Sequence, residues 1–232
     1  MNLPRVLILA GGLGTRLKDV SGGVPKPLVQ VGGRPFLDYL LEDLANKGFQ
    51  RVTLVVGYKK EMIRERYANS KTPLQIDFVE EEEPLGTGGA LKHAIQNYPN
   101  ESEFLSLNGD TFFGIDFENF LQDRKGMAKI ALSYQLDTRR YGRVEVASSG
   151  VIQKFLEKPK EVVSGDINGG IIWFKRSLLS HVIEKIFSFE KDVLEKAVQD
   201  GQIYGMRCEG HFIDMGTPES LKEAEELMPK WF

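Results

Sequence analysis

A glycine-rich loop that directly follows a short apolar run constrains this chain most strongly. Residues 6–10 (Val-Leu-Ile-Leu-Ala) are branched or small apolar side chains, which predicts a strand buried on both faces of a parallel sheet. Gly11, Gly12 and Gly14 follow and let backbone N–H groups approach an anion closely. Arg16 adds a planar cation that suits phosphate oxygens. The loop favours a phosphate site, although the same glycines could serve only a tight strand-to-helix turn.

Two familiar nucleotide-binding loops fit this stretch poorly. The dinucleotide fingerprint needs a third glycine at the position where Leu17 stands. The P-loop needs Gly-Lys-Ser or Gly-Lys-Thr, which does not occur anywhere in the sequence. If the loop binds phosphate, it does so in another type of fold.

The charge balance and the single cysteine exclude several classes of protein. Thirty Lys and Arg residues stand against 33 Asp and Glu residues, a net charge of −3, so we expect neither nucleic acid nor a membrane as the main partner. Cys208 is the one cysteine, which excludes an internal disulfide and a cysteine-rich zinc site. No apolar run is long enough for a signal-peptide core or a membrane span. We therefore expect a cytoplasmic protein.

Strands and helices alternate along the first half of the chain. The hydrophobic pattern predicts strands at 6–10, 51–56, 75–79 and 103–107, and helices at 35–47, 59–67 and 88–97. This alternation predicts an α/β fold with a doubly wound, mostly parallel, Rossmann-like sheet. In such sheets, ligands bind at the carboxyl ends of the strands.

The pattern changes in the second half. Strands predicted at 129–134, 142–146 and 151–157 indicate an antiparallel meander with one wetter face, on which a second substrate could lie. Further on we predict a strand at 171–174 opened by Asn-Gly-Gly, helices at 177–185, 189–199 and 218–228, and a strand at 203–208. No linker interrupts the pattern, so residues 1–232 are expected to form a single domain.

Three charged residues stand where they could meet a phosphorylated ligand. Lys26 lies between two prolines, a stiff mount for a cation, although a solvated lysine in a turn has the same pattern. Asp110 and Asp214 follow predicted strands and could hold a hard cation through oxygen, or simply cap turns. Four glutamates at 80–83 precede the segment 84–90; most would be solvated, but one could accept hydrogen bonds from guanine.

Seven short motifs, in this order, resemble those of the sugar-1-phosphate nucleotidyltransferases. They are Gly-Gly-Leu-Gly-Thr-Arg-Leu, Pro-Lys-Pro, Pro-Leu-Gly-Thr-Gly-Gly-Ala, Asn-Gly-Asp, Glu-Lys-Pro, Asn-Gly-Gly and Ile-Asp-Met-Gly-Thr-Pro. Within the family, the residues of these motifs are most similar to those of the D-glycero-α-D-manno-heptose 1-phosphate guanylyltransferases. The resemblance implies a nucleotide-binding part at about 1–110, a smaller antiparallel sugar-binding part at about 111–232, and a homodimer.

The resemblance also implies a role for each matching residue. The nucleoside triphosphate would be bound by Leu9, Gly11, Gly12, Gly14, Thr15, Glu81, Glu83, Gly86, Thr87 and Asn108. Arg16 and Lys26 would be catalytic, and Asp110 and Asp214 would share one Mg²⁺. The sugar 1-phosphate would be held by Gly142, Glu157, Lys158, Asn168 and Gly169.

The sequence constrains the identity of the base and of the sugar less than it constrains the type of reaction. Relatives that act on thymidine nucleotides carry a glutamine before the Pro-Leu-Gly-Thr segment; glutamates stand here, which disfavours thymidylyl transfer and favours GTP. Arg143 stands where relatives have a small or apolar residue, and it could face the sugar or lie on the surface. Mannose 1-phosphate with GTP, or N-acetylmuramate 1-phosphate with UTP, are the alternative substrates. A binding module that senses nucleotide or sugar phosphate without turnover is the alternative from another class.

Overall fold

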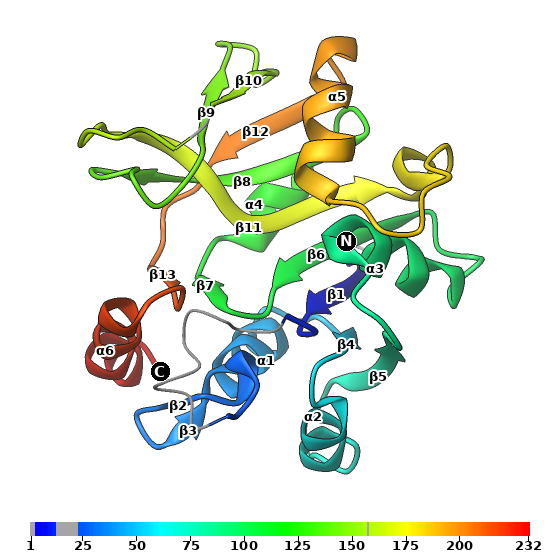
Figure 1. Cartoon of the computed structure of the whole chain (residues 1–232), viewed down its shortest axis with the longest axis vertical. Helices are drawn as coiled ribbons and strands as arrows, with labels where there is room; N and C mark the ends of the chain where they lie inside the picture. Colours follow the sequence, from blue (N-terminus) through cyan, green and yellow to red (C-terminus); the bar gives the residue numbers. More distant parts are fainter. Residues whose placement is uncertain (1–2, 13–22, 157) are drawn as a thin grey trace.

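A large mixed sheet runs through both halves of the chain. The computed structural model describes residues 3–12, 23–156 and 158–232, and these form a nine-stranded sheet with the order β10-β9-β11-β6-β1-β4-β5, in which β8 pairs with β11 and β12 pairs with β8 (Figure 1). Four strands of the first half are mutually parallel: β1 (Arg5–Leu9), β4 (Arg51–Val56), β5 (Gln75–Glu80) and β6 (Glu103–Asn108). This confirms the predicted α/β class and mostly parallel first half.

Helices cover the two faces of this parallel part. The helices α1 (Phe36–Asn46), α2 (Lys60–Tyr67) and α3 (Gly86–Gln96) connect its strands. Apolar residues of α1 recur at helical spacing and are buried in one core cluster, whereas α3 packs in a second cluster on the other face of the sheet. The predicted helices at 35–47, 59–67 and 88–97 are therefore confirmed within one or two residues.

The second half adds strands to the other edge of β6. Strand β11 (Gly165–Lys175) runs antiparallel to β6 and to β8 (Ala128–Gln135). Strands β9 (Arg143–Val146) and β10 (Ile152–Leu156) form a hairpin, and β12 (Ile203–Arg207) lies parallel to β8. Because β11 is long, it links the parallel part to this antiparallel region, and one sheet spans both halves.

Two predictions about the strands of this region are wrong. β8 and β9 are not neighbours, because β11 lies between them, so the strands do not form a simple meander. The Asn168-Gly169-Gly170 segment lies inside β11 and does not precede it. The register shifts between Asn168 and Ile172, and Gly170 has a φ of +79°. A bulge at two glycines carries no apolar side chains, which is why the hydrophobic pattern missed this part of the strand.

The predicted helix at 177–185 is also wrong. The chain forms only a short 3₁₀ turn there, η3 (Arg176–Leu179), and continues without regular structure to Ser188. The backbone of Phe187 explains this course: its N–H donates to the carbonyl of Leu85, and its carbonyl accepts from the N–H groups of Gly88 and Gly89. The predicted helix at 189–199 is present as a π turn, η4 (Phe189–Leu194), followed by α5 (Glu195–Ala197) and the 3₁₀ turn η5 (Val198–Asp200).

Small elements complete the carboxyl-end rim of the parallel strands. Strand β7 (Thr111–Phe113) follows β6 and pairs antiparallel with β13 (Phe212–Asp214), which leads into α6 (Pro218–Leu227). The remaining elements are η2 (Lys26–Leu28), β2 (Gln30–Val31), β3 (Arg34–Pro35), α4 (Phe117–Gln122) and η6 (Met228–Lys230). In the described part of the chain, no helix is long and apolar enough to cross a membrane.

Candidate active site

Two cavities adjoin where the parallel strands end. The first, here named the rim cavity, has a volume of about 230 Å³ and is lined by Leu9, Ala10, Gly12, Lys26, Pro27, Thr87, Asn108, Gly109, Asp110 and Glu190. The second, here named the side cavity, has a volume of about 360 Å³ and is lined by Gly11, Gly57, Tyr58, Lys59, Lys60, Glu61, Glu81, Glu82, Glu83 and Pro84. Gly11 lines one cavity and Gly12 the other, so the start of the glycine loop forms the boundary between them. This is the rim at which α/β sheets bind ligands.

Close packing explains why the loop begins with a glycine. A Cβ atom at position 11 would lie 2.3 Å from Oε2 of Glu81 and 3.0 Å from the backbone nitrogen of Gly57. Any side chain at this position would displace the Glu81 carboxylate. Gly11 therefore allows the backbone and an acidic side chain to line the side cavity together.

Lys26 and Asp110 form an ion pair in the lining of the rim cavity. The Nζ atom of Lys26 lies 2.9 Å from Oδ2 of Asp110, and the lysine side chain is 15% exposed. Pro25 and Pro27 flank this lysine, and the short turn η2 begins at it. The backbone of the lysine is thus held stiffly, and its side chain projects into a cavity that an anionic ligand could enter.

The β7–β13 pair brings Asp214 to Asp110. Asp214 lies opposite Thr111 in the register, and the N–H of Met215 donates to the carbonyl of Asp110 over 2.9 Å. Burial raises the pKa of Asp214 above its ordinary value, and the negative charge of Asp110 raises it further. Two neighbouring carboxylates are the type of ligand that a hard cation prefers, and the shared Mg²⁺ that the resemblance implies stays a prediction.

Arg140 is a residue of this cluster that the sequence analysis did not single out. Its Nη2 atom lies 2.9 Å from Oδ1 of Asp214, and its positive charge opposes the rise in the pKa of that carboxyl. In the sequence, Arg140 is the second of two adjacent arginines and stands two residues before Gly142. This pattern does not indicate a carboxylate partner. Among the described residues, Asp110 forms an ion pair with Lys26 and Asp214 forms one with Arg140.

The structure separates the two predicted base-reading glutamates. Glu81 points toward Gly11, and its Oε1 atom accepts a hydrogen bond of 3.1 Å from the backbone of Leu85; burial raises its pKa. Glu83 is about half-exposed and forms an ion pair with Lys185, which lowers its pKa. Both line the side cavity, but Glu81 lies against the glycine loop.

Thr87 and Asn108 line the rim cavity together with Glu190, which the sequence analysis did not select. The hydroxyl of Thr87 donates to Oε2 of Glu190 over 2.7 Å. Gly86, just before it, has a φ of +71°, and a Cβ atom there would lie 2.5 Å from the carbonyl oxygen of Phe187. Glu190 lies in a segment with a helical pattern, in which an acidic residue usually faces solvent, so its sequence carried no signal of a ligand contact.

The residues predicted to hold the sugar lie beyond the rim cavity. The Oδ1 atom of Asn168 accepts a hydrogen bond of 2.9 Å from the N–H of Gly170, and that glycine packs against the amide of Asn108. Gly169 is covered by Phe113: a Cβ atom there would lie 2.5 Å from its ring. Close packing against β7 thus accounts for this glycine. Gly142 and Lys158 line neither cavity, and Lys158 is exposed.

Arg143 is the first residue of β9 and directly follows Gly142. It is paired with Ile167 and Leu156 in the registers of β9, and its Cδ atom lies close to Gly165. Arg143 lines neither the rim cavity nor the side cavity. Four predicted site residues, Gly14, Thr15, Arg16 and Glu157, lie outside the described residues, and their roles stay predictions.

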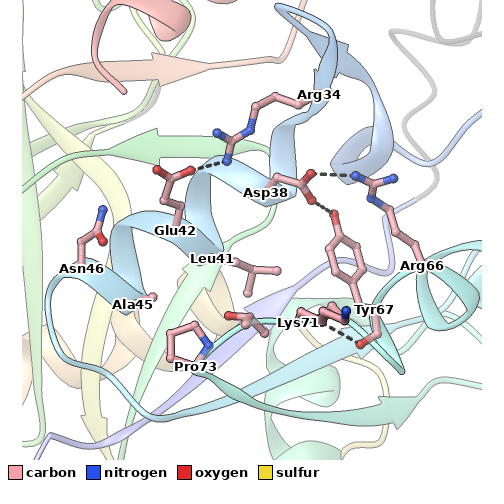
Figure 2. A pocket seen from close by; sticks show the side chains of 12 residues that line it. Arg34, Asp38, Leu41, Glu42, Ala45, Asn46, Arg66, Tyr67, Lys71 and Pro73 are labelled. Carbon is pink, nitrogen blue, oxygen red and sulfur yellow. Dashed lines mark hydrogen bonds and ion pairs between the residues drawn. The ribbon is translucent and has the colours of Figure 1, made fainter.

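A third cavity, of about 540 Å³, lies away from this rim, beside α1 and the end of α2 (Figure 2). Its charged side chains neutralise one another: Arg34 pairs with Glu42, and Asp38 accepts hydrogen bonds from Arg66 and Tyr67. It is larger than the rim cavity, but it contains none of the residues predicted to bind substrate. The types of residues that line the cavities therefore favour the two smaller cavities at the strand ends as the substrate site.

Comparison with known proteins is consistent with this geometry. The family model described as "Nucleotidyl transferase" matches residues 5–230. The D-glycero-alpha-D-manno-heptose 1-phosphate guanylyltransferase of Aneurinibacillus thermoaerophilus is 36% identical over 224 residues, which cover 95% of this chain and 96% of that protein. Mannose-1-phosphate guanyltransferase beta-A of Xenopus laevis is 33% identical over 242 residues, covering 98% of this chain and 67% of that protein.

A solved structure extends the similarity to three dimensions. The crystal structure of HddC from Yersinia pseudotuberculosis, complexed with GMP-PN, superimposes with a TM-score of 0.87 at 36% identity, and the match covers 97% of this chain and 100% of that one. The family match spans nearly the whole chain, and it includes the strand ends that carry the Lys26–Asp110–Asp214 cluster. The chain therefore belongs to the nucleotidyl transferase family.

Proposed function

We propose that this protein transfers the guanylyl group of GTP to D-glycero-α-D-manno-heptose 1-phosphate, giving GDP-heptose and pyrophosphate. The observation that carries the proposal is the cluster of Lys26, Asp110 and Asp214 in and beside a cavity that begins at the glycine loop. A heptose 1-phosphate guanylyltransferase is 36% identical over almost its full length, which supports the choice of sugar and base.

In this proposal, the nucleotide lies across both cavities. Its base occupies the side cavity, where the carboxylate of Glu81 accepts hydrogen bonds from the ring N–H and the amino group of guanine. Its phosphates lie against Gly11 and Gly12 and reach Lys26 in the rim cavity. Glu83, Gly86, Thr87 and Asn108 would complete the nucleotide site, with Gly14, Thr15 and Arg16 further along the loop. The sugar 1-phosphate approaches from the second half of the chain, past Gly142, Asn168 and Lys158.

The chemistry requires positioning and charge compensation. An oxygen of the sugar 1-phosphate attacks the α-phosphorus of GTP, a new P–O bond forms, and the bond from the α-phosphorus to the bridging oxygen breaks, releasing pyrophosphate. The attacking phosphate is already ionised at neutral pH, so no side chain needs to remove a proton. Lys26 would hold the nucleotide α-phosphate and the attacking phosphate in line and offset the charge that develops as they meet.

The two aspartates fit a magnesium ion. Asp110 and Asp214 bear like charges that raise the pKa of Asp214, and a divalent cation would remove this repulsion. Among the described residues, no group of three or more His, Cys, Asp and Glu side chains could hold a metal, so Mg²⁺ would take its other oxygen ligands from the nucleotide and from water. When bound, the ion would neutralise phosphate charge.

Mannose 1-phosphate is the second candidate acceptor. A mannose-1-phosphate guanyltransferase is 33% identical and matches 98% of this chain, which supports this acceptor as the alternative to the heptose phosphate. N-acetylmuramate 1-phosphate with UTP remains a third combination, which a carboxylate at Glu81 disfavours. The resemblance also implies a homodimer, which sedimentation equilibrium would test.

A substrate panel tests the proposal directly. GTP, UTP, CTP, ATP and dTTP are each combined with heptose, mannose and N-acetylmuramate 1-phosphates in the presence of Mg²⁺, and pyrophosphate release is measured. We expect the highest kcat/KM with GTP and the heptose phosphate. Strong turnover with UTP and none with GTP would overturn the guanine assignment, whereas nucleotide binding without pyrophosphate release in every combination would favour a non-catalytic sensor.

A further inference from the structure

Glu190 is a carboxylate in the rim cavity that the proposed mechanism does not use. It lies in η4 and lines the cavity together with Lys26, Asn108 and Asp110. Its Oε2 atom accepts hydrogen bonds from the hydroxyls of Thr87, at 2.7 Å, and Ser188, at 3.0 Å. In residues 3–12, 23–156 and 158–232, no ion pair involves Glu190, and Oε1 accepts no hydrogen bond. Among the described residues, one oxygen of this carboxylate therefore has no hydrogen-bond partner and can accept a hydrogen bond from a ligand.

The position of η4 in the fold indicates which ligand this oxygen meets. Phe189, the preceding residue, packs on Phe174 of β11 with ring centroids 5.2 Å apart. β11 borders β6 on the side away from β1, β4 and β5, and the same strand carries Asn168. Glu81, in contrast, follows β5 at the opposite edge of the sheet. Figure 1 shows β11 and β12 in the half of the molecule that contains α5, while β4 and β5 lie in the other half.

Charge excludes a phosphate as the partner of Glu190. A carboxylate repels a phosphate oxygen. Lys26 and Asp110 in this cavity, with Asp214 beside it, already provide the groups that suit phosphate and metal. A hydroxyl group can donate to the free oxygen, and a hydrogen bond to an ionised acceptor is stronger than one between neutral groups. On the β11 side of the cavity, the ligand with hydroxyl groups is the sugar of the acceptor.

We propose that Glu190 accepts a hydrogen bond from a hydroxyl group of the sugar 1-phosphate and is a specificity-determining residue for the acceptor. The inference rests on the function proposed above and adds a residue to the acceptor site. Thr87 and Ser188 hold the carboxylate from the other side, so its free oxygen has a defined direction. The loss of a hydrogen bond to a charged group corresponds to roughly 10- to 100-fold in affinity.

The test measures the KM for each substrate separately in the full-length protein. Glu190→Ala removes the carboxylate, and Glu190→Gln keeps one oxygen that can accept from Thr87 and Ser188. Glu195→Gln makes the same charge change at an exposed position one turn further on and is the matched control. Mannose 1-phosphate and its monodeoxy analogues serve as acceptors beside the heptose phosphate. Thermal unfolding of each variant reports whether the fold is retained.

We expect Glu190→Ala to raise the KM for the acceptor by about 10- to 100-fold while the KM for GTP changes by less than about twofold. One monodeoxy acceptor should bind the wild type and Glu190→Ala equally poorly, because it lacks the hydroxyl that Glu190 contacts. Glu190→Gln should retain the melting temperature and still raise the acceptor KM, and Glu195→Gln should behave as wild type.

Three results would overturn the inference. A rise in the KM for GTP alone would place the contact on the ribose or the base. Equal loss with all substrates, fully restored in Glu190→Gln, would make Glu190 only a structural support of Thr87. An active wild type with an unchanged acceptor KM in Glu190→Ala would show that no such contact exists. If the wild type releases no pyrophosphate from any combination, the proposed function itself fails, which is a distinct result.

Discussion

Asp110 and Asp214 each form an ion pair with a basic side chain of the described residues, and these pairs determine what single substitutions there should do. Lys26 contacts Asp110, and Arg140 contacts Asp214, in ion pairs whose partners are partly exposed to solvent. Partly exposed pairs contribute little to folding stability, typically below about 1 kcal/mol. The same charges can contribute far more to a reaction in which phosphate groups approach one another. Activity and stability should therefore separate at these positions.

We predict that Lys26→Ala and Asp110→Asn each lower kcat by roughly 10² to 10³, by analogy with the loss of a fixed donor in other active sites. Pyrophosphate release measures the loss, and the melting temperature should fall by no more than a few degrees. Lys154→Ala, at an exposed position of β10, is the control and should keep full activity. A collapse of thermal stability in both site variants would instead assign a structural role to the Lys26–Asp110 pair.

A half-buried acid in α1 predicts a pH effect on stability. Burial raises the pKa of Asp43 to about 6, and the charge of Lys47 opposes the rise only partly. Between about pH 4 and pH 6, the folded state holds more protons than the unfolded state, so this group's contribution makes the protein less stable as pH rises through that window. Asp43→Asn should therefore be more stable than the wild type at pH 7, by about 1–2 kcal/mol, with the difference vanishing near pH 4.

Urea unfolding at pH 4, 5, 6 and 7 measures this difference. Glu225→Gln, an exposed substitution on α6, is the control and should show no comparable dependence on pH. An Asp43→Asn variant that is less stable than the wild type at pH 7 would mean that the charged carboxylate has a stabilising partner.

At the scale of the elements, the start of α3 depends on a segment one hundred residues further along the chain. The backbone of Phe187 accepts hydrogen bonds from Gly88 and Gly89 and donates one to Leu85. The carbonyl of Phe187 supplies an acceptor for N–H groups that the start of a helix leaves unpaired, and the segment before it has no regular structure where a helix was predicted at 177–185. The same contact also fixes the first turn of α3, in which Thr87 lines the rim cavity.

We predict that Gly86→Ala destabilises the protein and lowers turnover. Gly86 has a φ of +71°, and the new Cβ atom would lie 2.5 Å from the carbonyl oxygen of Phe187. Gly48→Ala is the matched control, since Gly48 has a φ of +81° but no atom within 4 Å of an added Cβ. The control should cost about 1–2 kcal/mol from backbone strain alone and keep full kcat, whereas Gly86→Ala should cost more and lose activity. Urea unfolding and pyrophosphate release measure the two effects; equal costs with full activity in both would contradict the role given to the Phe187 contact.

At the scale of the whole molecule, one sheet runs through both halves of the chain, and the candidate site takes residues from both halves. Strands from both halves lie in one sheet, but the side cavity is built from residues 11–84, and the rim cavity also takes Glu190 from the second half. The β7–β13 pair likewise joins Asp110 to Asp214. A bound nucleotide and its metal would contact both halves, so ligand binding should stabilise the protein as a unit.

We predict that GTP with Mg²⁺ raises the melting temperature. At a ligand concentration of about 100 times Kd, the stabilisation is about 2.7 kcal/mol, which corresponds to roughly 5–10 °C for a domain of this size. Removing the metal with EDTA, or replacing Asp214 by Asn, should abolish most of the shift, and differential scanning fluorimetry measures it. A full shift in the presence of EDTA would mean that the aspartates do not bind a metal together with the nucleotide.

Local patterns in the sequence determined the parallel half of the fold and the main site candidates. Strand β1 with its glycine loop, the helix spacing of α1, the aspartate after β6 and the aspartate that ends β13 are each specified by residues within a few positions of one another. Seven short motifs, in the order typical of the family, were sufficient to identify the family without knowing which residues are in contact in the fold. Local signals also singled out Lys26, which lines the rim cavity, and the pair Glu81 and Glu83, of which only the structure places Glu81 against Gly11.

Only the tertiary structure decided which distant residues meet. Three features depend on contacts between segments far apart in sequence: the insertion of β11 between β6 and β8, the irregular course before Ser188, and the approach of Arg140 to Asp214. Glu190 belongs to the same class: its segment has the pattern of a surface helix, and it enters the cavity only because η4 packs between α3 and β11. Hydrophobic periodicity shows that a segment is buried but not which segment buries it. The sequence therefore determined the elements and the chemistry of the site, whereas long-range packing decided which residues belong to the site.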